Sequence, residues 1–353
     1  MKAGKWIKAL RCAGFLCILG LLLVFSGKIL REKSGEFLST DAERAVAEGC
    51  DVLFLGPSTV MNAVYPLELW HEFGISAYNC GTGSQSLLTS YYLIKELLKK
   101  EEPKLIVLDC GKARSKRSIV KIGYLHYITD ILPLLSPERL QMIRACADDR
   151  KYTLDETSGL LLPVLAYHGR WADVSSKDLA ADIKKVTYGA KVDVRTHTDV
   201  VPFQDYEASP DAALPAMAET CLRKIIELAS DRGIGLLLVT MPNMMQAYDV
   251  DQKEYELRVD SAAALQKVAD EYGTGHLNLI KEGEAIGLIP DEDTADGQHL
   301  NNRGASKFTR FIGGYIREHY EVPDHTAESA YAHLNGKYEA FEAYINGRTA
   351  KTA

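Results

Sequence analysis

The stretch Asp51-Val-Leu-Phe-Leu-Gly-Pro-Ser-Thr-Val60 decides how the rest of the chain is interpreted. Its apolar residues, Val52 to Leu55, lead directly into a Gly-Pro-Ser turn. A short apolar run that ends at Gly and Pro is typical of a buried strand in a parallel sheet. Open parallel sheets place their ligands at the carboxyl ends of their strands. Ser58 follows such an end, and we take it as the candidate nucleophile.

Strand and helix patterns alternate on both sides of a long middle segment. Further strands are predicted at residues 75–79, 104–109, 234–240 and 276–279, and helices at 65–73, 87–100, 214–232, 252–272 and 302–320. This alternation predicts a parallel sheet with right-handed crossovers. Residues 112–213 show no clean strand pattern and form too long a segment for a loop. We therefore expect a three-layer α/β domain over residues 36–323, with a mainly helical insertion at about 112–213. The polar tail, 324–353, contains helical fragments and receives no role.

The composition of the 353-residue chain is that of an ordinary globular protein, with 46% hydrophobic and 25% charged residues. Its formal charge of -7 and pI near 5.8 argue against a nucleic-acid-binding protein, which normally presents a basic face. The same values argue against tight peripheral binding to anionic lipid.

The amino-terminal segment departs from this average, because Cys12 to Gly27 carry no charge. With its apolar flanks the segment reaches roughly 20 residues, enough to cross a bilayer. A cleaved signal peptide is the alternative, since a basic start and an apolar centre fit both. Val24-Phe25-Ser26 offers no small-x-small cleavage site, which favours an uncleaved anchor over residues 1–35. The basic residues before the segment predict a single-pass protein of the cell membrane, with the amino end in the cytoplasm and the body outside.

Seven cysteines are present, and two of them lie in the apolar segment. The other five show neither a metal-ligand spacing nor an obvious disulfide framework. They are Cys50, Cys80, Cys110, Cys146 and Cys221.

A catalytic serine needs a base and a group that orients the base. The run Asp296-Gly-Gln-His299 lies on a predicted loop just before the last helix. The aspartate can accept from one ring nitrogen of the histidine while the other nitrogen faces Ser58, as in a Ser-His-Asp triad. Each element has an alternative when taken alone: Ser58 as a helix N-cap, and the Asp-His pair as solvated loop residues. Their placement after the first and last strands favours the catalytic interpretation.

The arrangement resembles the SGNH (GDSL-type) hydrolase superfamily, and more narrowly its membrane-anchored branch of DltD-like and alginate-acetylation-type proteins. The Gly-Asp-Ser block of that family corresponds to Gly56-Pro57-Ser58, and its second block to Gly81. The final block corresponds to Asp296-x-x-His299-Leu-Asn, which continues to Gly304-Ala305. The likeness covers residues 51–111 and 233–320. It implies that Ser58, His299 and Asp296 are the nucleophile, the base and the orienting carboxylate.

Two departures from the family pattern bear on the oxyanion hole. Pro57 replaces the aspartate of the first block, which leaves the Ser58 N–H in place. The third block should supply an asparagine, but the matching strand end reads Gly111-Lys112-Ala113-Arg114. The expected donors are therefore the N–H groups of Ser58 and Gly81, with Asn243 as a further candidate. Loss of one oxyanion donor typically costs about 10²–10³ in rate.

Two other patterns admit a binding role. Tyr167-His168-Gly-Arg170-Trp171 offers aromatic faces and an arginine for a sugar or an acyl donor, or else it belongs to the packed core of the insertion. Asp291, Asp293 and Asp296 with His299 lack the full ligand pattern of a calcium loop, so no metal is predicted.

The resemblance implies a serine esterase or O-acyltransferase, with acetyl the expected acyl group, that uses no cofactor. Its expected partners are a cell-envelope polysaccharide and an acyl donor. The alternative is a weakly catalytic or non-catalytic partner of a multi-spanning membrane O-acyltransferase, which the missing asparagine favours. Chain order and spacing do not separate transfer from hydrolysis, because both use the same triad.

Overall fold

The computed structural model describes residues 2–30, 49–118, 121–175, 184–246 and 250–351. Its body is built on a parallel five-stranded sheet with the order β2-β1-β3-β4-β5. The strand that contains Leu53 has a neighbour on each side: Leu53 pairs with Tyr78 on one side and with Ile106 on the other. The strands are β1 (Val52–Leu55), β2 (Ala77–Asn79), β3 (Leu105–Asp109), β4 (Gly235–Thr240) and β5 (Gly275–Asn278).

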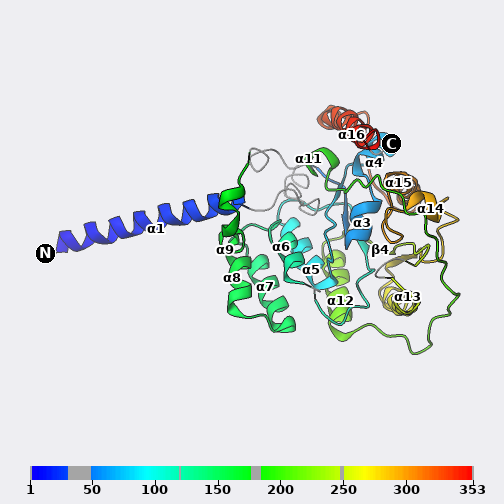
Figure 1. Cartoon of the computed structure of the whole chain (residues 1–353), viewed down its shortest axis with the longest axis horizontal. Helices are drawn as coiled ribbons and strands as arrows, with labels where there is room; N and C mark the ends of the chain where they lie inside the picture. The colour runs from blue at the N-terminus through cyan, green and yellow to red at the C-terminus, as the bar shows by residue number, and fades with distance from the viewer. Residues whose placement is uncertain (1, 31–48, 119–120, 176–183, 247–249, 352–353) are drawn as a thin grey trace.

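Helices cover both faces of this sheet, which confirms the predicted three-layer α/β fold (Figure 1). Successive side chains of a strand point to opposite faces, so Leu53 and Leu55 pack into one core and Val52 and Phe54 into the other. The first core is closed by α5 (Leu87–Leu97), α12 (Ala216–Asp231) and α13 (Gln252–Tyr272). The second is closed by α3 (Ser58–Ala63), α4 (Pro66–Phe73) and α15 (Asn302–His319).

The last helix of the domain, α15, packs closely on α4 at a pair of adjacent glycines. A Cβ atom at Gly313 would overlap the ring of Phe73, whereas one at Gly314 would meet nothing within 4 Å. At the amino end of α15, the Asn301 side chain accepts from the backbone N–H groups of Arg303 and Gly304, both at 3.1 Å. Such a cap satisfies donors that have no partner inside the helix. It thereby fixes the end of the loop that carries Asp296 and His299.

The insertion after β3 consists of two different parts. Its first part is helical, with α6 (Ile122–Thr129), α7 (Pro137–Arg150), α8 (Leu154–Leu161), α9 (Pro163–Tyr167), a 3₁₀ turn η1 (His168–Asp173) and, further along, α11 (Lys184–Thr187). Residues 188–215 form neither helix nor strand, so the expectation of a mainly helical insertion describes only the first part. The second part runs past β2, α3 and the start of α15, where it exchanges backbone hydrogen bonds with Asn79, Met61 and Asn302.

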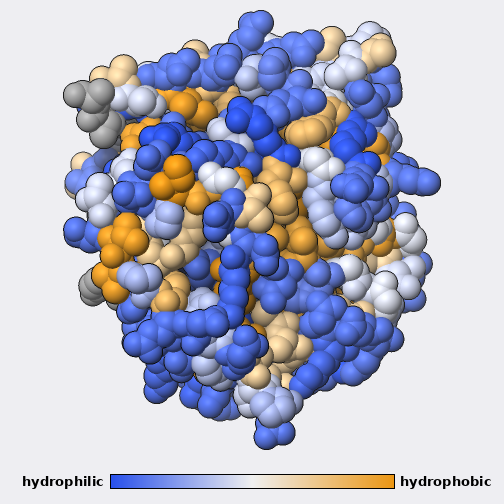
Figure 2. All heavy atoms as spheres, turned by 90° about the vertical axis from the view of Figure 1, so that its right-hand side faces the viewer, coloured by the Kyte–Doolittle hydropathy of each residue, from blue (hydrophilic) through white to orange (hydrophobic). Residues whose placement is uncertain are grey.

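The amino-terminal helix α1 (Lys2–Leu30) includes an apolar stretch, Lys5–Gly27, that is long enough to cross a membrane and is not buried by the rest of the protein. Its carboxyl end contacts α9 (Figure 1). Figure 2 shows the face of the molecule away from α1, on which hydrophilic residues predominate. The predicted boundary between the anchor and the domain, at residues 35 and 36, lies outside the described residues.

The carboxyl-terminal tail is part of the folded body and not a polar appendage. The tail contains a 3₁₀ turn, η2 (Ser329–Tyr331), and the helix α16 (His333–Thr349). Leu334 and Phe341, both on α16, are buried and share a core with Tyr65. Before η2, the His325 ring bridges two carboxylates, with its Nε2 atom 2.5 Å from Asp51. The sequence pattern did not predict that part of the tail is buried, because the apolar residues of the tail are few and widely spaced.

All five cysteines of the body are buried, the two in α1 are exposed, and none of these seven described residues forms a disulfide. Burial raises the pKa of Cys146 to about 12 and that of Cys221 to about 11. The pKa values of Cys50 and Cys110 are also raised, chiefly by burial. These thiols act as small apolar side chains.

Candidate active site

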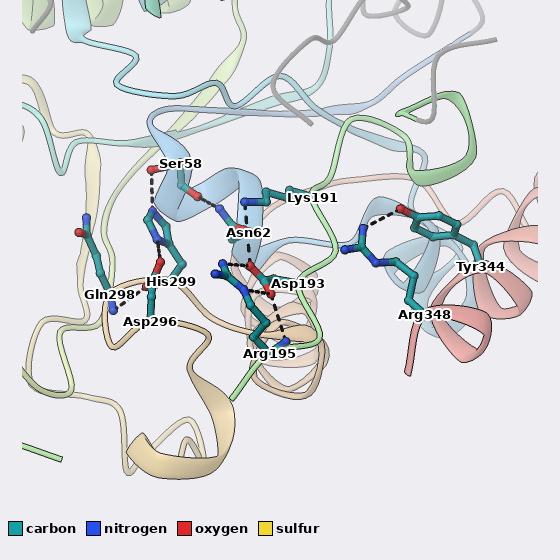
Figure 3. A network of polar contacts seen from close by, with 10 residues as sticks. All are labelled: Ser58, Asn62, Lys191, Asp193, Arg195, Asp296, Gln298, His299, Tyr344 and Arg348. Carbon is teal, nitrogen blue, oxygen red and sulfur yellow. Dashed lines mark hydrogen bonds and ion pairs between the residues drawn. The ribbon is translucent and has the colours of Figure 1, made fainter. Parts of the chain in front are cut away.

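Ser58, His299 and Asp296 meet in one hydrogen-bonded chain, although the first two are separated by 241 positions (Figure 3). The Oγ atom of Ser58 lies 2.7 Å from Nε2 of His299. The Nδ1 atom of His299 lies 2.8 Å from Oδ2 of Asp296. This is the geometry in which an imidazole removes a proton from a serine while a carboxylate holds its tautomer and orientation. The three side chains singled out in the sequence are thus brought together.

The turn that presents Ser58 depends on Gly56. The residue has φ of +141°, and a Cβ atom there would lie 2.7 Å from Cβ of Asp109 on the adjacent strand. Pro57 is extended and serves as the N-cap residue of α3, so the helix begins at Ser58. Only glycine permits this backbone conformation and this close approach without strain. The serine is therefore placed at the mouth of the sheet by the conformation of the preceding turn.

Two buried asparagines hold the helix that carries the serine. The Asn62 side chain donates to the Ser58 carbonyl at 2.6 Å. The Asn79 side chain, at the end of β2, donates to the carbonyls of Val60 at 3.0 Å and Val64 at 2.9 Å. Buried amides of this kind fix their neighbours because leaving either group unpaired is costly. The position of the short helix α3 is therefore fixed by Asn62, which lies on the helix itself, and by Asn79, which lies on the strand β2.

The Asp296 loop is a tight turn that points both of its functional side chains the same way. Ala295 donates to the carbonyl of His299 at 2.8 Å. The second carboxylate oxygen of Asp296, Oδ1, accepts from the backbone N–H groups of Gln298 and His299, at 3.1 and 2.8 Å. Burial acts to raise the pKa of Asp296, but these N–H groups and the His299 ring outweigh it and hold the pKa well below 3.8. The carboxylate stays ionised over the whole neutral range.

A pocket opens directly beside Ser58, between the ends of β1, β3 and β4 and the side of α13. It encloses about 440 Å³, counting space open to solvent. Asp109 lies on its wall, where Thr59 donates to one carboxylate oxygen and the Gly111 N–H donates to the other at 2.7 Å. Burial raises the pKa of Asp109 in spite of these hydrogen bonds. Space for a small chemical group therefore lies next to Ser58.

The three expected oxyanion donors differ in their availability. The N–H of Ser58 lies at the start of α3, where helix N–H groups have no partner inside the helix. The N–H of Gly81 donates to Oδ1 of Asn79 at 3.0 Å and is therefore engaged. Asn243 lines the pocket, and its Oδ1 atom accepts from Arg258 at 2.5 Å. This contact orients the amide so that its NH₂ group, 3.3 Å from the Met241 carbonyl, has a second hydrogen to donate.

The aromatic motif at 167–171 does not reach this pocket. Tyr167 donates to Asp130 at 3.2 Å, within the helical insertion. Arg170 donates to the carbonyl of Leu30, at the end of α1, at 2.5 Å. His168 and Trp171 are exposed, and none of the four lines the pocket beside Ser58. The structure brings together the triad and Asn243 but leaves this motif on another side of the molecule.

Among the residues that the structure describes, no group of three or more His, Cys, Asp or Glu side chains is arranged to hold a metal ion. Asp293, one of the acidic loop residues, pairs with Lys307 at 2.6 Å. Asp296 is committed to His299.

Sequence patterns missed several residues that shape the site. Asn62 and Asn79 act through backbone carbonyls, for which no side-chain pattern exists. Arg114 follows β3 and Arg258 lies on α13, and both line the pocket although 144 positions separate them in the chain. No local spacing predicts that these two arginines line the same pocket. The ends of β3 and β4, however, could have been expected to share one edge of the sheet.

Comparison with known proteins gives a likeness of overall structure only. No family model matches the sequence, and no curated protein matches it. A structure from Lactobacillus plantarum, solved by a structural genomics consortium, aligns at 13% identity with a TM-score of 0.39, over 76% of this chain and 97% of the other. A Bacteroides fragilis structure described as a "putative acylhydrolase" aligns at 12% identity with a TM-score of 0.34, over 76% of this chain and 86% of the other.

Proposed function

We propose that the protein is a serine O-acyl esterase or O-acyltransferase. Ser58 attacks the carbonyl carbon of an ester while Nε2 of His299 takes the hydroxyl proton. The tetrahedral intermediate collapses, and the alcohol leaves with the proton returned from His299. Water, or a hydroxyl of an acceptor, then attacks the acyl-serine in the same way. Asp296 stabilises the imidazolium in both halves of the reaction.

The observation that carries this proposal is the unbroken chain of contacts from Ser58 to His299 to Asp296, with distances of 2.7 and 2.8 Å. A serine at a helix start with an N-capping role would not require a histidine at its oxygen. A solvated Asp-His pair would not require a serine at the other ring nitrogen. The adjacent pocket supplies the space that an acyl group needs beside the nucleophile.

The proposed setting is the outer face of the cell membrane, with α1 as an uncleaved single-pass anchor. The length and apolar composition of Lys5–Gly27 support this location, and the basic residues before it favour a cytoplasmic amino end. A polysaccharide of the cell envelope is the proposed acyl donor or acceptor. The polymer is inferred from the resemblance and the anchor, because none of the contacts above identifies a sugar.

A second candidate function is that of a partner protein for a multi-spanning membrane O-acyltransferase, with little catalysis of its own. The hydrogen bond that engages the Gly81 N–H favours it, since this donor is then unavailable to an oxyanion. The intact triad opposes it.

A serine-reactive fluorophosphonate probe separates the two functions. We expect the full chain to be labelled, and S58A and H299A to lose labelling by at least about 10²-fold. The controls are S158A and H319A, which alter a half-buried serine and an exposed histidine outside the site. Absence of labelling in well-folded wild-type protein would contradict the catalytic function and favour the partner role.

A further inference from the structure

The pocket beside Ser58 carries an excess of cationic side chains. Lys112, Arg114 and Arg258 line it, and Asp109 is the acidic residue that lines it with them. Glu254, outside the lining, pairs with Arg114 and lies 3.7 Å from Nε of Arg258. Arg258 is buried, so its charge is poorly screened by solvent. A partly enclosed site with this balance favours a negatively charged ligand.

A buried hydroxyl group on the same wall points to the same conclusion. Ser261 follows Arg258 by three positions on α13, so the two share a face of the helix. The residue is 7% exposed and lines the pocket. Its Oγ atom has no hydrogen-bond partner among the described residues. A buried donor without a partner is costly, and a ligand oxygen would relieve that cost.

We infer that this pocket binds an anionic group, a carboxylate or a phosphate, carried by the ester that Ser58 attacks. Arg258 and Ser261 provide charged and neutral donors for its oxygens, which are the donor types that such anions accept. Leu265 and Met241 line the apolar part of the same pocket and suit a short carbon chain between the anion and the ester. The inference rests on the proposed function only in naming the ester. The anion site itself is open to measurement without catalysis.

The binding test uses the full chain with S58A, so that no turnover occurs. Inorganic phosphate and succinate are titrated separately against thermal unfolding at constant ionic strength, with chloride as the reference. We expect both anions to raise Tm, and S261A or R258Q to weaken the apparent affinity at least fivefold. The matched control is R232Q, which removes an arginine paired with Glu102 at the surface. S261A keeps the test decisive if R258Q fails to fold. Equal affinity in all variants, or no anion effect beyond that of chloride, would overturn the inference.

A kinetic test compares two 4-nitrophenyl esters of equal chain length, the butyrate and the succinate monoester. We expect wild-type kcat/KM to favour the succinate monoester about tenfold, and S261A to reduce that ratio. A preference for the butyrate would overturn the inference. Turnover of neither ester, together with the expected phosphate binding, would refute the acyl-transfer function and leave the anion site supported.

A second inference concerns the aromatic motif that the active site does not use. Gly27 of α1 lies against Pro163 and Val164, and Arg170 donates to the Leu30 carbonyl, so α9 and η1 adjoin the end of the apolar helix. Several large apolar side chains of this region are exposed, among them Leu165 at 48% and Trp171 at 57%. The others are Leu161, Leu162 and Val174.

We propose that the face formed by α9 and η1 rests on the lipid surface from which α1 emerges. Its apolar residues are continuous with an apolar helix of membrane-spanning length. Tryptophan is favoured at such an interface, where its ring is half in the apolar phase. The occupant is lipid and not a protein partner, because the neighbouring element is itself the candidate membrane span.

Quenching by brominated lipids tests this proposal in vesicles that contain the full chain with W6F. Trp171 then reports on the interface, while Trp70 is buried and donates to Asn335. We expect brominated lipid to quench the emission, and W171F to abolish the quenching. Quenching of Trp171 by aqueous iodide but not by brominated lipid would refute the proposal, as would failure of the chain to float with the vesicles.

Discussion

At the scale of single residues, the carboxylate of Asp296 is held in its ionised form by the His299 ring and by two backbone N–H groups. Its pKa lies well below 3.8, so protonation of Asp296 should not limit the rate in the neutral pH range. We expect D296N to keep the fold and to lower the labelling rate by about 10³–10⁴-fold, because an amide no longer fixes the tautomer. Rate measurements with the fluorophosphonate probe, with E292Q as the control, check this. A D296N rate within threefold of wild type would contradict the assigned role.

The difference between these residues and the rest of the site shows what local sequence can predict. Asp296 and His299 are three positions apart, and Ser58 follows an apolar strand, so each has a local pattern. Arg258 is buried and donates to Asn243, which precedes it by 15 positions. A charged residue within an amphipathic helix is usually solvated, and only the packing of α13 on the sheet reveals its burial. The placement of Arg258 in the pocket therefore remained outside the sequence prediction.

At the scale of elements, the pair Gly313 and Gly314 gives opposite expectations on one turn of α15. G313A places a methyl group against Phe73 and should destabilise the fold by about 1–3 kcal/mol. G314A adds a methyl group in open space and should stabilise the helix by about 0.5–1 kcal/mol. Urea unfolding of both variants measures the two effects, and each is the control of the other. Equal shifts in the two variants would refute the close packing of α15 on α4.

The strands and helices were predicted to within a few residues because their apolar periodicity is local. The strand expected at 75–79 is shorter, Ala77–Asn79, since residues 75 and 76 precede the ladder with β1. Residues 188–215 were the weakest part of the prediction. Backbone hydrogen bonds connect Tyr188, Lys191 and Asp193 to β2, α3 and α15, and such partners leave no periodic pattern in the segment itself.

At the scale of the whole molecule, His325 joins the carboxyl-terminal tail to the first strand of the sheet. Burial acts to lower its pKa, but the carboxylates of Glu328 and Asp51 outweigh burial and raise the pKa above 6.5. A group with a raised folded-state pKa stabilises fully below the unfolded pKa and loses that effect as pH rises through the folded pKa. The Tm of H325Q should therefore lie further below that of wild type at about pH 6 than at about pH 9. Each kcal/mol of unfolding free energy that the substitution removes should lower Tm by roughly 2–4 °C.

The control for this pH dependence is H319Q, because His319 is exposed on α15. Its Tm difference from wild type should be small at both pH values. A constant or increasing difference for H325Q with rising pH would contradict the charge-assisted contact with Asp51.

The burial of every cysteine in the body has a practical consequence for mapping the topology of the chain. Thiol reagents act on the thiolate, and burial both raises the pKa and blocks access. The natural chain should therefore give almost no signal with a membrane-impermeant maleimide, since Cys12 and Cys17 lie within the apolar helix. One cysteine introduced at an exposed position such as Leu135 would be a unique reporter on intact cells. The wild-type thiols can stay in place, so the side of the membrane can be read without a cysteine-free variant.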